Sequence, residues 1–85
     1  MNKKKVLFVD DDKFLLDMYA LKFSKAGYEV KTADSTEAAM KLVKDGYVPD
    51  VMLVDIIMPG MDGLEFISEV RKQNLAANAV VIFLT

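Results

Sequence analysis

Short apolar runs alternate along the chain with longer stretches in which apolar residues recur every three or four positions. The runs are rich in β-branched and aromatic residues, and most are continuous, as in strands buried on both faces of a parallel sheet. They predict four strands, at Lys5 to Val9, Tyr28 to Ala33, Asp50 to Asp55 and Ala79 to Leu84. The periodic stretches between them predict three helices.

Each predicted helix follows a residue that caps helix N-termini well, namely Asp12, Ser35 or Asp62. The first helix is expected over about residues 13–26, because Gly27 is a favoured stop, and the second through about residue 44.

Apolar residues lie in two rows along the first helix. The first row holds Phe14, Leu15, Met18, Leu21 and Ala26, and the second holds Leu16, Ala20 and Phe23. Two rows predict that this helix packs against partners on two sides.

The strand–helix alternation predicts an α/β fold with a parallel sheet, right-handed crossovers and helices on both faces. Functional sites in such sheets lie beyond the carboxyl ends of the strands. Asp10, Asp55 and Thr85 follow or end three of the predicted strands. We therefore expect these polar groups to converge on one crevice.

Composition narrows the possible chemistry. The chain has 85 residues, of which 53% are hydrophobic and 28% charged, as in a single soluble globular domain. It contains no cysteine and no histidine, which excludes disulfides, thiolate metal sites and histidine-based triads. Chemistry must therefore come from carboxylates, hydroxyls, lysines or backbone groups.

The charge pattern gives no sign of binding to a charged macromolecule or surface. The net charge of −2 gives no electrostatic reason to expect direct binding to nucleic acid or to a membrane. The basic residues 3–5 precede an apolar run that is too short for a signal peptide. No segment reaches the roughly 20 apolar residues of a membrane span, so a cytoplasmic protein is expected.

The acidic residues carry the strongest chemical signal. Asp10, Asp11 and Asp12 close the first strand, and Asp55 closes the third. Carboxylates crowded at one sheet edge stay ionised together only around a cation, and Mg²⁺ suits a site of carboxylates and phosphate oxygens. An aspartate there can also act as a nucleophile and form an acyl phosphate. Taken alone, the three aspartates could be a helix cap with solvated neighbours, and Asp55 could belong to a turn at the end of a strand. Their occurrence together at matching strand ends favours a functional site.

Several blocks resemble the signature blocks of response-regulator receiver domains of two-component signalling. They are Leu7-Phe8-Val9-Asp10-Asp11-Asp12, Pro49-Asp50-Val51-Met52-Leu53-Val54-Asp55, Met58-Pro59-Gly60-Met61-Asp62-Gly63 and Val81-Ile82-Phe83-Leu84-Thr85. The resemblance implies a flavodoxin-like fold with four parallel strands in the order 2-1-3-4 and three helices.

The resemblance also implies a role for each matching residue. Asp55 matches the phosphoacceptor, and Thr85 matches the hydroxyl that moves toward the phosphoryl group as a switch. Asp11 matches the direct Mg²⁺ ligand, and Asp10 its companion, usually through water. The backbone carbonyl of Ile57 matches the group that completes the metal site. Pro59 and Gly63, at matching loop positions, shape the turn that follows.

A receiver of this kind takes its phosphoryl group from a sensor histidine kinase, a phosphotransfer protein or a small phosphodonor. Mg²⁺-dependent phosphorylation of Asp55 then acts as a conformational switch. Such a chain is not an enzyme in the usual sense, since it catalyses at most its own phosphorylation and dephosphorylation.

One departure from the family pattern concerns the C-terminal part. The family continues past the threonine with a helix, a strand and a final helix, and that strand carries a lysine that pairs with the phosphoryl group. Residues 1–85 are therefore expected to form a partial, truncated receiver with impaired phosphorylation. Its fourth strand would become an apolar sheet edge, and its first helix would lose a neighbour, which would leave one of the two apolar rows uncovered. Self-association or element swapping is therefore expected.

Two other functions fit the same residues. A receiver fold can serve as an interaction or oligomerisation module without phosphotransfer. Alternatively, Asp10 and Asp12 have the Asp-x-Asp spacing of a HAD-type phosphohydrolase at a strand end. Phe14, where that family has a small hydroxyl or aliphatic residue, and the short chain argue against the phosphohydrolase.

Overall fold

A computed structural model describes residues 3–58 and 60–84. The strands are β1 (Lys5–Val9), β2 (Glu29–Ala33), β3 (Val51–Asp55) and β4 (Val80–Leu84), and the helices are α1 (Lys13–Lys25), α2 (Thr36–Lys44) and α3 (Gly63–Lys72). The predicted elements are confirmed. The observed strands β2, β3 and β4 each begin one residue later than predicted, and α1 ends one residue earlier. Pro59 and Thr85 lie outside the described residues.

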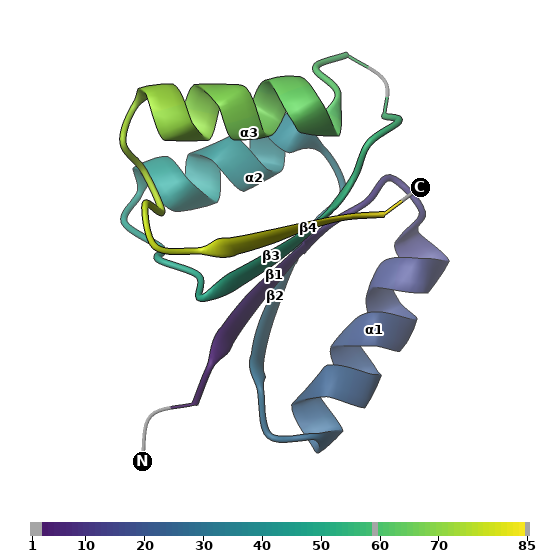
Figure 1. Ribbon diagram of the computed structural model, residues 1–85. Helices are drawn as coiled ribbons and strands as arrows, with labels where there is room; N and C mark the ends of the chain where they lie inside the picture. Colours follow the sequence, from purple (N-terminus) through teal and green to yellow (C-terminus); the bar gives the residue numbers. More distant parts are fainter. Residues whose placement is uncertain (1–2, 59, 85) are drawn as a thin grey trace.

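The four strands form one parallel sheet in the order β2-β1-β3-β4, as expected. Helix α1 covers one face, and α2 and α3 lie side by side on the other (Figure 1). Because all strands are parallel, the ends of β1 and β3 lie at the same edge of the sheet. This arrangement brings the residues that follow them together.

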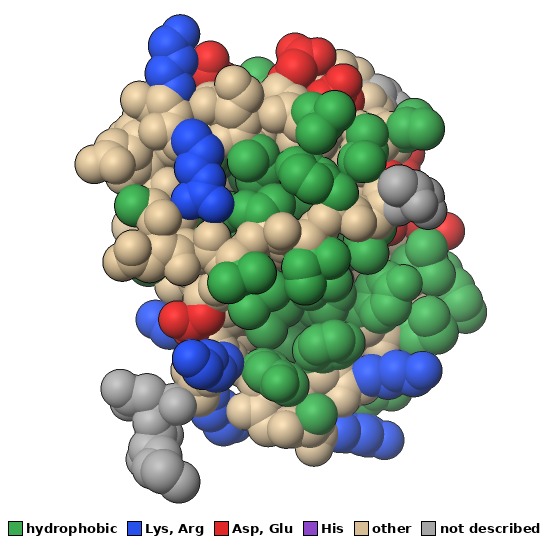
Figure 2. Space-filling model, in the orientation of Figure 1, with side chains coloured by type: hydrophobic (Ala, Val, Ile, Leu, Met, Phe, Trp, Pro, Cys, Tyr) green, Lys and Arg blue, Asp and Glu red, His purple; other side chains and the backbone are tan. Residues whose placement is uncertain are grey.

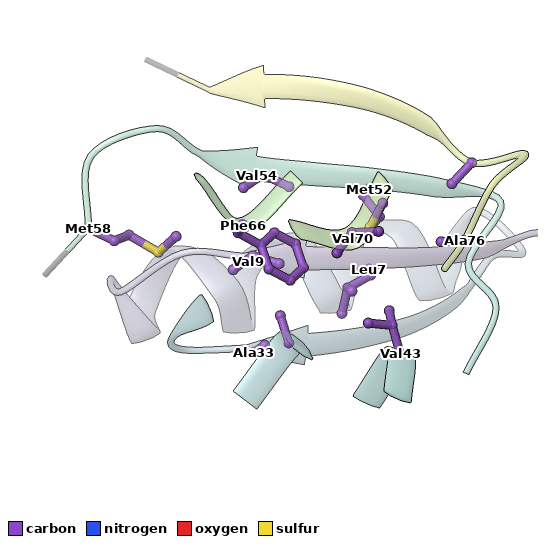
Figure 3. Packing of buried hydrophobic residues seen from close by; sticks show 12 residues of the cluster. Leu7, Val9, Ala33, Val43, Met52, Val54, Met58, Phe66, Val70 and Ala76 are labelled. Atoms are coloured by element: carbon purple, nitrogen blue, oxygen red, sulfur yellow. The ribbon is translucent and has the colours of Figure 1, made fainter. Parts of the chain in front are cut away.

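The larger core fills the space between the sheet and the pair α2 and α3 (Figure 3). Leu7, Met52 and Val54 of the sheet pack there with Phe66 and Val70 of α3, and each is fully buried. Every second residue of β3 points to this face, as the pleat of a strand requires.

The smaller core joins β1 to α1. Phe8 stacks on Tyr19 with ring centroids 5.1 Å apart and meets Phe23 edge-on at 5.1 Å. Leu16 is also buried there. These contacts fix α1 against the strand that leads to the acidic residues.

Among the described residues, α1 is covered on one side only, and one of its two apolar rows is uncovered, as expected for residues 1–85. Phe14 and Leu21 of the first row are 75% and 59% exposed, whereas Leu16 and Phe23 of the second row pack on the sheet. Among these residues, α1 has no neighbouring helix on its face of the sheet, so only the row that faces the sheet is covered. No helix among these residues is long and apolar enough to span a bilayer.

The predicted caps are confirmed and set where each helix begins. The Asp12 carboxylate accepts hydrogen bonds from the backbone N–H groups of Phe14 and Leu15, at 3.0 and 3.3 Å. The Asp62 carboxylate accepts one from the N–H of Glu65 at 2.9 Å. Both helices thus start directly at the edge that carries the acidic residues.

Candidate functional site

Three aspartates meet at the carboxyl edge of the sheet. Asp10 directly follows β1, Asp11 is the next residue, and Asp55 is the last residue of β3. One carboxylate oxygen from each lies within 4.8 Å of the others. The topology thus brings together the two acidic segments that the sequence keeps 44 residues apart, from Asp11 to Asp55.

Asp10 is held firmly in its position. Its backbone N–H donates to the carbonyl of Ala33 at 3.1 Å, and its carboxylate accepts from the N–H of Asp12 at 2.9 Å. Its side chain is buried, unlike that of exposed Asp11. Asp10 therefore presents a fixed oxygen, and Asp11 a more adaptable one.

Burial and repulsion both disfavour charge on Asp10. Burial is the main cause that raises the pKa of Asp10 above its ordinary value, and the charges of Asp55 and Asp11 raise it further. The hydrogen bond from Asp12 acts in the opposite direction. The Asp10 carboxylate is thus destabilised as an anion, which a cation beside it would relieve.

Asp55 is placed by the loop that follows it. Its carboxylate accepts from the N–H of Ile57 at 3.2 Å, and the Ile56 N–H donates to the carbonyl of Leu84 at 3.2 Å. The N–H of Gly63 donates to the carbonyl of Ile56 at 3.0 Å, which closes the loop onto the start of α3. The side chain of Ile57 points into solvent.

A hollow of about 300 Å³ opens beside the carboxylates. It is lined by Asp10, Asp11, Asp12, Asp55, Leu15, Tyr19 and Leu84. Three of these residues, Leu15, Tyr19 and Leu84, were not predicted to belong to the site. The helical spacing of Leu15 and Tyr19 after Asp12 was the available signal, because residues four apart share one face of a helix.

The donor set fits Mg²⁺. The three side chains offer only carboxylate oxygens, the ligand type that hard divalent cations prefer, and they leave room for water and phosphate oxygens. The carboxylate of Asp12 is engaged as a helix cap, and the close group is Asp10 with Asp11 and Asp55. This grouping does not favour the Asp-x-Asp arrangement of a phosphohydrolase.

Comparison with known proteins gives one family. The model of the response regulator receiver domain matches residues 6–85. The uncharacterized transcriptional regulatory protein YrkP of Bacillus subtilis is 36% identical over 81 residues. That alignment covers 95% of this chain and 33% of YrkP, so the chain spans about a third of this relative's length.

Solved structures give the same result for the fold. Chemotaxis protein CheY4 of Vibrio cholerae superposes with a TM-score of 0.89 at 33% identity, over 96% of this chain and 68% of that one. A CheY-like receiver domain protein of Methanospirillum hungatei superposes with a TM-score of 0.90 at 34% identity, over 99% and 66%. Response regulator TrrA of Thermotoga maritima, solved in complex with Mg²⁺ and BeF, has a TM-score of 0.84 at 36% identity, over 96% and 69%.

Proposed function

The chain belongs to the response-regulator receiver family, and we propose that it accepts a phosphoryl group on Asp55 in a Mg²⁺-dependent reaction that acts as a conformational switch. The observation that carries this proposal is the approach of the Asp10, Asp11 and Asp55 carboxylates to within 4.8 Å at the sheet edge. A charge cluster of this kind, partly buried and without histidine or cysteine, suits phosphoryl chemistry around a divalent cation.

The reaction would use the free oxygen of the Asp55 carboxylate. That oxygen attacks the phosphorus of the donor, the bond from phosphorus to the leaving group breaks, and an acyl phosphate forms on Asp55. The second oxygen is held by the N–H of Ile57, which fixes the direction of attack. In-line positioning is most of what a phosphoryl transfer needs.

Asp10, Asp11 and Asp55 would hold Mg²⁺, with the Ile57 carbonyl as a further ligand. When bound, the ion neutralises charge on the transferred group and on the carboxylates. Asp10 offers a buried, fixed oxygen for this purpose, and Asp11 an exposed one. The likeness to TrrA, which was solved with Mg²⁺ and BeF, supports the choice of metal.

The remaining roles follow from the family. Thr85 would provide the hydroxyl that responds to the phosphoryl group, and a sensor histidine kinase or phosphotransfer protein would provide that group. Leu84, which precedes Thr85, lines the hollow with Asp55. In the sequence, Thr85 thus directly follows a residue that lines the hollow.

NMR spectra of the backbone amides of the isotope-labelled chain test the proposal in two steps. Addition of Mg²⁺ should shift the amides of residues 10–12 and 55–57, and subsequent addition of acetyl phosphate should shift them again. If Mg²⁺ shifts these amides but acetyl phosphate then changes nothing, the metal site is supported and phosphotransfer is refuted. No shift with either reagent would refute both.

We also propose that the 85-residue chain self-associates through β4. Val80 and Ile82 on this edge strand are 59% and 46% exposed, whereas the other edge strand, β2, carries the charged residues Glu29 and Lys31. Figure 2 shows hydrophobic side chains spread over this face, across β4 and toward α1. An apolar edge with free backbone groups favours pairing with another strand.

Sedimentation should therefore show association that grows with concentration, and Ile82→Lys should weaken it at least about tenfold, since burying a charge at such a contact is costly. Val48→Lys is the control, because Val48 is also exposed, at 60%, but lies in the loop before β3 and not on β4 itself. A monomer at all concentrations would contradict this proposal, as would equal effects of the two substitutions.

A further inference from the structure

The side chain of Thr36 makes a contact that the proposed function does not use. Thr36 is the first residue of α2 and is only 3% exposed. Its hydroxyl donates a hydrogen bond to the backbone carbonyl of Met61 at 2.9 Å. Met61 lies in the loop between Asp55 and α3, so this bond ties the start of α2 to the loop of the acidic site.

The hydroxyl of Thr36 is not needed to cap its own helix. The Ser35 side chain already accepts a hydrogen bond from the N–H of Ala38 at 3.1 Å, which provides the cap of α2. The Thr36 hydroxyl is therefore free to act on another segment, and its only recorded partner among the described residues is Met61.

Among the described residues, few side chains support the loop near Met61. Its first part is fixed by the bond from Ile56 to Leu84 and by the burial of Met58. Near Met61, in contrast, a cavity opens between α2 and the loop; it is lined by Thr36, Glu37, Met40, Lys41, Lys44, Asp45 and Met61. Because packing there is incomplete, the partly buried hydrogen bond from Thr36 contributes more to the position of the loop than it would in a filled core, beside the backbone bond from Gly63 to Ile56.

We propose that Thr36 is a positioning residue of the metal site. Its hydroxyl holds the loop that carries Ile57, so that the Ile57 backbone keeps its place beside the Asp55 carboxylate. Thr36 does not line the acidic hollow itself and acts only through Met61. The inference rests on the proposed function, because it concerns the same Mg²⁺ site.

Two substitutions at Thr36 separate the hydroxyl from the rest of the side chain. Thr36→Val keeps the shape and removes the donor, whereas Thr36→Ser keeps the donor and removes a methyl group. A titration with Mg²⁺ alone, monitored by the NMR shifts of the backbone amides, gives the dissociation constant. For Thr36→Val this constant should be about threefold to tenfold higher than for the original chain. Thr36→Ser should stay within about twofold of the original chain. In the absence of Mg²⁺, the Ile57 amide should exchange with solvent faster in Thr36→Val only.

Glu37→Gln is the matched control, since Glu37 lines the same cavity but is exposed. An unchanged Mg²⁺ affinity in Thr36→Val would overturn the inference while leaving the proposed function intact. Equal weakening in Thr36→Val and Thr36→Ser would also overturn it, because packing rather than the hydroxyl would then be responsible. Absence of Mg²⁺ binding in the original chain would refute the metal site, and the positioning role with it.

Discussion

Replacing Gly63 by alanine is expected to lower the free energy of unfolding by about 3 kcal/mol, at the upper end of the usual cost of overpacking. Gly63 is buried at the start of α3, where a Cβ atom would meet the backbone carbonyl oxygen of Asp55 far inside van der Waals contact. It would also lie 2.9 Å from the side chain of Val54. Backbone and a buried strand cannot move aside cheaply, so the helix start or the strand end must shift.

Urea denaturation measures this effect, and Gly46→Ala is the matched control. Gly46 has a φ angle of 103° but open space around it, so alanine there should cost only about 1 kcal/mol of backbone strain. Near-equal costs for the two substitutions would show that α3 does not pack against Asp55 as closely as described.

Replacing Asp10 by asparagine is expected to change stability and metal binding in opposite directions. Without metal, the free energy of unfolding should rise by about 1 kcal/mol, because a buried charge beside Asp11 and Asp55 is removed. Asparagine can still accept the hydrogen bond that the N–H of Asp12 donates. Affinity for Mg²⁺ should fall at least about tenfold, since even outer partners of metal ligands contribute that much.

Unfolding curves with and without Mg²⁺ would measure both effects on the same sample. Asp12→Asn is the control, because Asp12 serves as the cap of α1 and asparagine caps equally well. Its stability and Mg²⁺ affinity should therefore stay close to those of the original chain. If Asp12→Asn weakened Mg²⁺ binding as much as Asp10→Asn, the assignment of Asp12 as a cap alone would be wrong.

The sequence was sufficient to predict the architecture and the meeting of the acidic residues. Asp10 and Asp55 each come at the end of an apolar run, and in a parallel sheet such ends must share one edge. The approach of Asp10, Asp11 and Asp55 therefore follows from topology alone. Their roles as metal ligands and phosphoacceptor remain predictions, as does that of Thr85, which lies outside the described residues.

Periodicity could not decide which apolar row of a helix is buried. Phe14 and Leu21 fit a helical row as well as Leu16 and Phe23 do, yet they are exposed. The choice depends on how α1 is rotated against the sheet. That rotation is set by Tyr19, which stacks on Phe8, and by Phe23, which meets Phe8 edge-on; these residues are at least 11 positions from Phe8 in the sequence.

Contacts that join side chains to distant backbone groups were also beyond sequence reasoning. From its place in the last turn of α3, Arg71 suits the C-terminal dipole of the helix. Its guanidinium also donates to the carbonyls of Ala77 and Ala79, at 3.0 and 3.1 Å, and so fixes the connection into β4. The bond from Thr36 to Met61 is a similar case, because it joins residues 25 positions apart.

The most direct test of the account is the intact mass of the chain after incubation with acetyl phosphate. We expect the addition of one phosphoryl group in the presence of Mg²⁺ and none in EDTA. We also expect none in Asp55→Asn, which can still accept the hydrogen bond from Ile57. A folded chain that binds Mg²⁺ but gains no phosphoryl group, or an adduct that persists in Asp55→Asn, would contradict the assignment of Asp55 as the phosphoacceptor.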